Sequence, residues 1–326
     1  MSLGRVVVTD SGPLLAPGIA WLRARGVEVE VLAGGDPSAK VAALSTADAA
    51  LVGVEAFTAT EMAAVAAAGA GPRFVIRCGV GYDVIDVEAA TRHGMRVANV
   101  PDYCTDEVAD HSFALLLAAA RGLPYFLSAW RTERKWDWGG GGQPVPRLAD
   151  LTLGIVGAGR IGRAVATRAR GFGMKLLAAD PRPPAEIETV PLHELLARSD
   201  VVTLHCPYTA ATHHLLNDDA FRQMKPGSIL VNTSRGGVVD SAALERGLER
   251  NQPAGAALDV LEGEPVPDLE QPLLRHPRVL VTPHVAYYSV ASLQNLGVFA
   301  AQNVFGFLNG EAPRHVVNDV LAAVTP

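Results

Sequence analysis

Short apolar runs alternate with helix-prone segments along most of the chain. Five runs in the first hundred residues are short and contain β-branched residues, as strands do. They lie at 5–10, 27–32, 49–53, 73–77 and 95–100. Alanine-rich segments such as TATEMAAVAAAG separate some of them. This alternation predicts parallel βαβ units.

A second series of the same kind follows a long helical pattern at 106–123 and an irregular glycine- and proline-containing segment around 139–146. Its strand-like runs are LTLGIVG, KLLAAD, DVVTLH, GSILVNT, AGAALDV and RVLVTPH. The pattern is helix-like again through 289–309. We therefore expect an α/β protein with two doubly wound parallel-sheet domains, the first discontinuous in sequence. The expected bounds are 1–100 plus 286–326 for one domain and 101–285 for the other.

Composition excludes several classes of protein. The 326 residues are 49% hydrophobic and 19% charged, which is typical of one or two well-buried globular domains. The formal charge of −6 and the lack of a lysine- and arginine-rich run argue against direct nucleic-acid binding. No signal-peptide core and no run of ~18 apolar residues is present, so we expect a cytoplasmic protein without a membrane span. Three widely spaced cysteines without a CxxC pair predict neither a disulfide framework nor a metal site.

The most specific local motif is G-x-G-x-x-G, formed by Gly157, Gly159 and Gly162 directly after a predicted strand. The first glycine permits a tight turn, and the second lets the backbone approach a pyrophosphate. The third lets the helix pack closely on the strand, while the helix N-terminus supplies free N–H groups and partial positive charge. Glycines also punctuate ordinary turns, but the strand, helix and second strand together predict a dinucleotide site.

The second strand of this unit ends in Asp180, 18 residues beyond Gly162. A carboxylate there accepts hydrogen bonds from an adenine ribose and repels a 2′-phosphate, which favours NAD over NADP. Arg182 lies close by and weakens this preference, because an arginine can partly compensate the acidic charge.

Three later strands end in residues that can do chemistry. Arg235 follows one strand, Asp259 ends the next and leads into LEGEP with Glu264, and His284 follows the last. Ligands of open α/β sheets gather beyond the carboxyl ends of strands. Each residue alone has an ordinary explanation, as a solvated arginine, turn acids or a packed histidine. Their convergence beside a nucleotide motif favours a catalytic site, with His284 as the proton carrier.

Five motifs in order make the chain resemble the NAD-dependent D-specific 2-hydroxyacid dehydrogenases, over residues from about 73 to 318. They are LGIVGAGRIG, HCP, MKPGSILVNTSRGGVVD, AALDVLEGEP and TPH. The resemblance implies a Rossmann NAD-binding domain and a flavodoxin-like substrate domain. It implies that Arg235 binds the substrate, that Glu264 is the carboxylate partner, and that His284 is the acid/base. It also implies that Asp259 contacts the nicotinamide carboxamide.

The resemblance implies further binding residues. The other cofactor-lining positions are Arg160, Ile161, Cys206, Pro207, Thr212 and Thr233. The stretch RCGVGYDVID at 77–86 resembles the family's substrate loop, in which the backbone amides near Val80 and Gly81 bind the carboxylate and Arg77 faces the substrate.

Some positions depart from the family pattern and leave the substrate open. Val84 stands where asparagine is common, and Asp110 where glutamate often precedes His111. HVAYYS resembles the C-terminal-binding proteins, the corepressor branch of the family, so Tyr287 either reaches the substrate pocket or packs at a domain junction. His111 and the pair His213–His214 are interpreted as packing, interface or surface residues.

Two functions of different classes follow. The first is an NAD-dependent oxidoreductase that interconverts a small 2-oxo acid and its D-2-hydroxy acid, of phosphoglycerate, glyoxylate or hydroxypyruvate type. The alternative is an NADH-sensing regulatory protein with residual activity. The complete set of Arg235, Glu264 and His284 favours the enzyme. The resemblance also implies a homodimer, with 106–122 and 130–146 as candidate interface.

Overall fold

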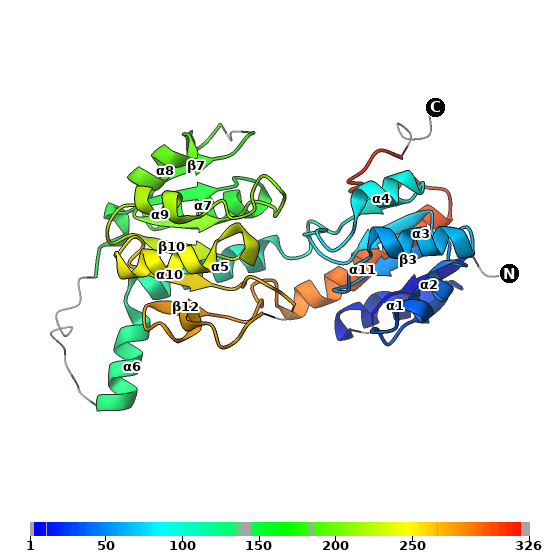
Figure 1. The fold of residues 1–326 in the computed structure, drawn as a ribbon, viewed down its shortest axis with the longest axis horizontal. Coiled ribbons are helices and arrows are strands. Elements are labelled where there is room, and N and C mark those ends of the chain that lie inside the picture. Colours follow the sequence, from blue (N-terminus) through cyan, green and yellow to red (C-terminus); the bar gives the residue numbers. More distant parts are fainter. Residues whose placement is uncertain are drawn as a thin grey trace. The chain divides into compact units, whose positions relative to one another are not determined.

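The computed structural model describes residues 3–10, 12–134, 136, 138, 145–182, 185–265 and 267–320. The chain divides into two compact units, Met1–Cys104 with Ser289–Pro326, and Thr105–Tyr288 (Figure 1). We call them unit 1 and unit 2. Each contains a parallel sheet with helices packed on it, which confirms the predicted α/β class with two parallel-sheet domains.

Unit 1 is built on a five-stranded sheet in the order β2-β1-β3-β4-β5, and every pair in it is parallel. The strands are β1 (Arg5–Val8), β2 (Glu28–Val31), β3 (Ala49–Val52), β4 (Phe74–Arg77) and β5 (Arg96–Ala98). The helices are α1 (Ala16–Arg23), α2 (Pro37–Leu44), α3 (Ala59–Ala68), α4 (Val87–Arg92) and α11 (Val290–Leu308), with the 3-10 turn η1 (Pro13–Leu15). All five strands predicted for this part of the sequence are present.

The interior of unit 1 follows from its apolar runs. Every residue of β3 is buried, as expected for a central parallel strand that is covered on both faces. Helix α11 packs against α1, where a Cβ on Gly18 would lie 2.0 Å from the carbonyl oxygen of Gly297. Glycine at this crossing lets the two helix backbones approach closely.

Unit 2 has a seven-stranded parallel sheet in the order β12-β11-β10-β9-β6-β7-β8. Its strands are β6 (Thr152–Val156), β7 (Lys175–Ala179), β8 (Glu188–Thr189), β9 (Val201–Leu204), β10 (Ile229–Asn232), β11 (Gly255–Leu258) and β12 (Val279–Val281). Its α-helices are α5 (Thr105–Ala120), α6 (Leu123–Glu133), α7 (Arg160–Gly171), α8 (Leu192–Arg198), α9 (Asp218–Gln223) and α10 (Ser241–Glu249). The 3-10 turns are η3 (Leu148–Asp150), η4 (Gly236–Val238) and η5 (Pro272–Arg275).

The order of this second sheet reverses between β6 and β9. In doubly wound folds, ligands bind outside the carboxyl ends of strands at such a reversal. The glycine motif follows β6, and the HCP motif follows β9, so both lie at the reversal. The sheet therefore places the predicted cofactor residues at one edge.

Two elements of unit 2 differ from the sequence prediction. The helix expected over 106–123 ends at Ala120, and a separate helix, α6, begins at Leu123 after Gly122 adopts φ +63°. Pro124 at the start of α6 suits the first turn of a helix, where its missing N–H needs no partner. The two-residue edge strand β8 was not predicted, because two residues show no periodicity. Most of the irregular segment around 139–146, namely 139–144, lies outside the described residues.

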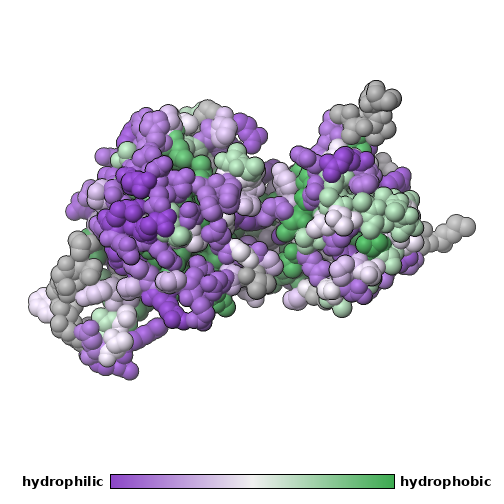
Figure 2. Space-filling view, in the orientation of Figure 1, coloured by the Kyte–Doolittle hydropathy of each residue, from purple (hydrophilic) through white to green (hydrophobic). Residues whose placement is uncertain are grey.

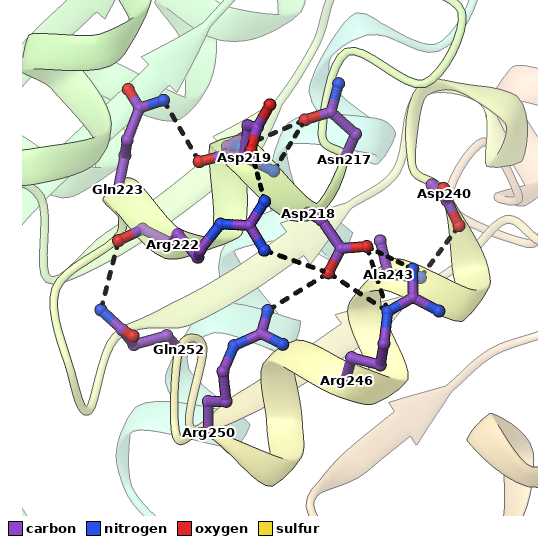
Figure 3. Close-up of polar contacts among 11 residues, drawn as sticks. Asn217, Asp218, Asp219, Arg222, Gln223, Asp240, Ala243, Arg246, Arg250 and Gln252 are labelled. Atoms are coloured by element: carbon purple, nitrogen blue, oxygen red, sulfur yellow. Dashed lines mark hydrogen bonds and ion pairs between the residues drawn. The ribbon is translucent and has the colours of Figure 1, made fainter.

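Ion pairs tie the surface helices α9 and α10 together. Figure 3 shows Asp218 of α9 facing Arg246 of α10 and Arg250, the residue that follows α10, with Arg222 from its own helix beside it. Helices α9 and α10 lie on a largely hydrophilic face of unit 2 (Figures 1 and 2). Exposed pairs of this kind contribute little each, so we assign the cluster a local structural role.

Among the described residues, no single helix is both long and apolar enough to cross a bilayer. Helices α5 and α6 meet those limits only when taken together, and they are bent by 62° relative to each other. The buried residues of α5 pack into the core of unit 2, which explains its apolar composition.

Candidate active site

Three neighbouring strands bring the predicted catalytic residues to one edge of the sheet. Asn232 of β10 is paired with Leu258 of β11, which is paired with Val281 of β12. Arg235 and His284 each lie three residues beyond these aligned positions. The loops also touch, because a Cβ on Gly236 would lie 2.0 Å from the carbonyl carbon of Leu261. Only glycine allows this approach.

His284 has an unusual backbone and one open ring nitrogen. Its φ of +54° lies in the left-handed region, which non-glycine residues rarely adopt. Its Nδ1 lies 2.5 Å from Oε2 of Glu264. Its Nε2 has no hydrogen-bond partner among the residues the structure describes, and the side chain is 42% exposed. The ring can therefore exchange a proton with a ligand through Nε2.

Glu264 is held by its own loop. Its Oε1 accepts a hydrogen bond of 2.7 Å from the amide of Leu261, while Oε2 faces the imidazole. A carboxylate on one ring nitrogen fixes the tautomer and the orientation of the ring. The structure therefore brings together the two residues that the sequence proposed as a pair.

Asp259 is buried beneath the loop that carries His284, with 1% of its surface exposed. Its Oδ1 accepts hydrogen bonds from the Thr282 hydroxyl at 2.5 Å and the Val285 amide at 2.9 Å, and its Oδ2 accepts one from the Ala286 amide at 2.8 Å. Burial alone would raise the pKa of Asp259, but hydrogen bonds from His111, Thr282 and the two amides lower it overall. The group is therefore a charged support for this loop, and its predicted contact with nicotinamide stays a prediction.

Arg235 is half-buried at the start of η4. One guanidinium nitrogen donates to the carbonyl of Ser234 at 2.8 Å, and the side-chain amide of Asn232 donates to the Arg235 carbonyl at 2.9 Å. These contacts fix the backbone and one arm of the guanidinium. A guanidinium has five N–H donors, so it can also hold a carboxylate.

The glycine motif fits a dinucleotide pyrophosphate. Gly157 has φ +90°, and a Cβ there would lie 2.6 Å from the amide nitrogen of Cys206. A Cβ on Gly162 would lie 2.2 Å from the carbonyl oxygen of Gly157. Around Gly159, a Cβ would meet no atom within 4 Å, and helix α7 begins there without a side-chain cap or an acidic residue in its first turn. The open space and the uncapped amides suit an anion.

Asp180 lies against this motif. Its Oδ2 accepts a 2.7 Å hydrogen bond from the Ala158 amide, and its Oδ1 accepts one of the same length from the Arg182 amide. Each carboxylate oxygen keeps a further acceptor position. The acid thus lies against the glycine motif, and its predicted contact with an adenine ribose stays a prediction.

The remaining predicted cofactor residues lie in well-fixed places. Burial, with a contribution from the Asp180 charge, raises the pKa of Cys206 to about 11, so the thiol stays protonated. The Thr212 hydroxyl donates to the carbonyl of Pro207 at 2.7 Å and holds this loop closed.

The other predicted cofactor residues are at the end of β10 and on α7. The Thr233 hydroxyl lies 2.6 Å from that of Ser112. Two further positions are on α7: Arg160 is exposed at its first residue, and Ile161 packs against the core.

The predicted substrate loop is in unit 1, directly after β4. Nη1 of Arg77 donates to the Cys78 carbonyl at 2.5 Å, and a Cβ on Gly79 would overlap this guanidinium. The amides of Val80 and Gly81 donate no hydrogen bond to any residue that the structure describes. Two open neighbouring amides beside a guanidinium suit a carboxylate.

Tyr287 lies beside His284 in unit 2. The two ring centroids are 6.3 Å apart, and the rings meet edge to face. Tyr288, by contrast, is 62% exposed. The structure therefore places the Tyr287 ring next to the imidazole.

Two histidines make side-chain contacts that the sequence did not predict. Nε2 of His111 lies 3.0 Å from the Thr282 hydroxyl, and Nε2 of His214 lies 2.5 Å from Oε1 of Glu262. Both contacts join residues far apart in the chain, so no local pattern could reveal them. No group of three or more metal-ligating side chains occurs within the described part of the chain.

Comparison with known proteins agrees with this geometry. The family model for the NAD binding domain of D-isomer specific 2-hydroxyacid dehydrogenases matches residues 113–286. A glyoxylate reductase of Korarchaeum cryptofilum is 44% identical over 264 residues, which cover 78% of each chain. A D-3-phosphoglycerate dehydrogenase of Archaeoglobus fulgidus is 36% identical over 320 residues, covering 96% of this chain and 59% of that protein.

A solved structure has the same fold over nearly the whole length. It is D-lactate dehydrogenase from Aquifex aeolicus, complexed with NAD and lactic acid. The TM-score is 0.82 at 26% identity, and the match covers 98% of this chain and 97% of that one. Likeness in both sequence and fold thus extends through both units.

Proposed function

The chain belongs to the D-isomer specific 2-hydroxyacid dehydrogenase family, and we propose that His284, Glu264 and Arg235 carry out its reaction. The protein is an NAD-dependent oxidoreductase that interconverts a 2-oxo acid and a 2-hydroxy acid. Nothing in the comparisons supports the alternative of an NADH-sensing regulator like the C-terminal-binding proteins.

The proposal depends most on the His284–Glu264 pair. Reduction of a 2-oxo acid places negative charge on the carbonyl oxygen, and a proton must reach that oxygen. NADH, when bound, would supply the hydride. His284 donates the proton from Nε2, while its Nδ1 stays hydrogen-bonded to Glu264, 2.5 Å away. The carboxylate keeps the ring oriented before and after the transfer.

Arg235 binds and polarises the substrate in this proposal. Its fork can hold the substrate carboxylate with two parallel hydrogen bonds and stabilise the charge that grows on the neighbouring oxygen. The contacts to Ser234 and Asn232 support this role, because they position the group before substrate arrives.

We propose a small 2-oxo acid of glyoxylate, hydroxypyruvate or phosphohydroxypyruvate type as substrate. The names of the relatives support this class. Unit 2 would bind the cofactor, through Gly157, Gly159, Arg160, Ile161, Gly162, Asp180, Cys206, Pro207, Thr212, Thr233 and Asp259. The remaining residues proposed to bind the substrate are Val80 and Gly81, through their amides, Arg77 and Tyr287.

We further propose a cytoplasmic homodimer. Helix α6 has no buried residue, and its apolar side chains Leu123, Tyr125, Leu127 and Trp130 are 42–51% exposed. A run of large apolar groups on one helix is typical of a subunit interface. Sedimentation velocity tests this: a dimer is expected, and Leu127→Glu should shift it toward the monomer.

The reaction is tested by NADH oxidation with glyoxylate, hydroxypyruvate, pyruvate, phenylpyruvate and 3-phosphohydroxypyruvate. Turnover with at least one of them is expected, and it should be lower with NADPH because Asp180 repels the 2′-phosphate. Binding of NADH without turnover of any of these acids would contradict the proposal.

Arg235→Ala tests the substrate role. We expect kcat/KM to fall by roughly 10³-fold or more, with both kcat and KM affected, because one charged anchor is lost. Arg246→Ala removes a surface arginine from the cluster of Figure 3 and serves as the matched control. Equal kinetic constants for these two variants would refute the assignment.

A further inference from the structure

Helix α5 reaches the end of β12 through one side chain. Nε2 of His111 lies 3.0 Å from the hydroxyl oxygen of Thr282 and 3.5 Å from Oδ1 of Asp259. The Thr282 hydroxyl in turn lies 2.5 Å from the same carboxylate oxygen. His111, Thr282 and Asp259 therefore form a short chain of polar contacts beneath the loop that carries His284.

The chemistry of the groups sets the direction of these hydrogen bonds. Hydrogen bonds keep the pKa of Asp259 low despite its burial, so the carboxylate is charged and can only accept. The single hydroxyl hydrogen of Thr282 is therefore donated to Asp259. The hydroxyl oxygen must then accept from His111, which carries its proton on Nε2. The hydrogen bonds are therefore donated in sequence, from His111 to Thr282 and from Thr282 to Asp259.

Asp259 holds the backbone at His284 and at the two residues that follow it. Its carboxylate accepts the amides of Val285 and Ala286, and its carbonyl accepts the amide of His284 at 2.7 Å. The left-handed conformation of His284, with φ +54°, is costly for a residue with a Cβ. Such a conformation persists only where its surroundings enforce it. The contacts to Asp259 supply that constraint.

The same turn of α5 anchors a second strand end. Ser112 is buried, and its hydroxyl lies 2.6 Å from that of Thr233, directly after β10. Consecutive side chains of one helix thus hold the strand ends on either side of β11. This makes α5 a rigid support for the edge where the reaction takes place.

We propose that His111 is a positioning residue for His284 and acts through Thr282 and Asp259. This inference rests on the proposed function, because it assumes that the geometry of His284 sets the rate. His111 does not itself contact the substrate in this proposal. Its Nε2–H locks the Thr282 hydroxyl toward Asp259, and the carboxylate then holds the loop in its strained conformation.

Matched substitutions test the chain link by link. His111→Phe keeps a ring but removes the donor, and Thr282→Val keeps the shape but removes the hydroxyl. Each should lower kcat by about 10-fold through slight misplacement of the imidazole, with the NADH dissociation constant nearly unchanged. His111→Gln and Thr282→Ser retain the donor and the hydroxyl and should recover most of the activity. His193→Phe on α8, an exposed histidine, is the control and should match the wild type.

The kcat of a double variant distinguishes this positioning role from a merely structural one. If both residues act through one chain, the double variant His111→Phe/Thr282→Val should be no slower than either single variant. Full additivity of the two losses, or wild-type kcat in His111→Phe, would overturn the inference.

A measurement without substrate or cofactor gives independent evidence. Hydrogen exchange of the Val285 and Ala286 amides in the apo-protein should become about 10-fold faster in His111→Phe, because their acceptor is less well fixed. Unchanged exchange would overturn the inference. His284→Gln tells the two levels apart: if this variant is inactive while His111→Phe is fully active, only the inference fails, and if it is active, the proposed function fails.

Discussion

Two histidine–glutamate pairs meet at the loop LEGEP, and they invite comparison. His214 lies 2.5 Å from Glu262, and His284 lies 2.5 Å from Glu264. Both histidines have left-handed backbones, with φ +47° and +54°. In each pair the two residues come from loops far apart in the sequence. By distance and backbone alone, the pairs are nearly identical.

The second nitrogen of each ring makes the difference. Nδ1 of His214 lies 3.9 Å from a carboxylate oxygen of Asp240, and its ring stacks on that of His213 with centroids 3.9 Å apart. Burial would raise the pKa of Glu262, but hydrogen bonds from His214 and Ser241 lower it overall. His284 has no such second partner in the described part of the chain. The His214–Glu262 pair, which we call the clamp, links two loops and has both ring nitrogens near carboxylates. The His284–Glu264 pair leaves Nε2 available for a ligand.

The largest expected effect separates the two imidazoles. His284→Gln should lower kcat by about 10³-fold, because general acid catalysis is lost, with little change in NADH affinity. His214→Gln should keep kcat close to the wild-type value. Steady-state kinetics with the best substrate of the panel would measure both. Equal losses of kcat in the two variants would contradict the distinction between the two histidines.

Substitutions of the two glutamates should differ in kcat by a smaller factor, and the Glu264 variant should again be the slower one. Glu264→Gln weakens the contact that orients the ring, so kcat is expected to fall by roughly 10- to 100-fold. Glu262→Gln removes a charge from the clamp and should leave kcat nearly unchanged. A larger loss of kcat in Glu262→Gln than in Glu264→Gln would reverse our assignment.

Another histidine, His205, lies directly after β9 and provides a pH-dependent contrast. Burial lowers the pKa of His205 to about 3, from 6.5 when exposed. Below pH 6.5 the unfolded chain binds a proton that the folded protein excludes, so this ring lowers the free energy of unfolding as pH falls from 6.5 toward 3. It has no such effect above pH 6.5. His205→Asn should reduce the acid-side slope by up to about 1.4 kcal/mol per pH unit in urea titrations. A slope equal to that of the wild type would show that the ring is protonated in the fold.

The smallest expected effect concerns stability. A glycine substitution relieves the left-handed backbone strain at position 284 or 214. At position 214 it also removes the contacts of the histidine ring to Glu262, Asp240 and His213. We expect the free energy of unfolding of His284→Gly to exceed that of His214→Gly by about 1 kcal/mol. Thermal and urea denaturation would measure this difference. The reverse order would mean that the His284 contacts stabilise the fold more than the clamp does.

The sequence was informative where chemistry and local pattern coincide. Gly157, Asp180 and His284 each follow a strand that its apolar run predicts, so their place at the carboxyl edge was foreseeable. The contacts of His111 and His214 were not, because they span 171 and 48 residues and leave no periodic signal. Helix α6 was missed because the apolar pattern at 106–123 continues across the break at Gly122. Local patterns therefore predicted most strands and the residues at their ends, while helix breaks and contacts between distant loops required the structure.

The central claim is that Nε2 of His284 faces the reacting oxygen of the substrate. A crystal structure with NADH and oxamate, an unreactive analogue of a 2-oxo acid, tests it directly. We expect Nε2 at about 2.6–3.2 Å from the analogue's amide oxygen, with Nδ1 still on Glu264 and the Arg235 guanidinium on its carboxylate. Oxamate bound out of reach of His284, or an imidazole turned away from it, would contradict the account.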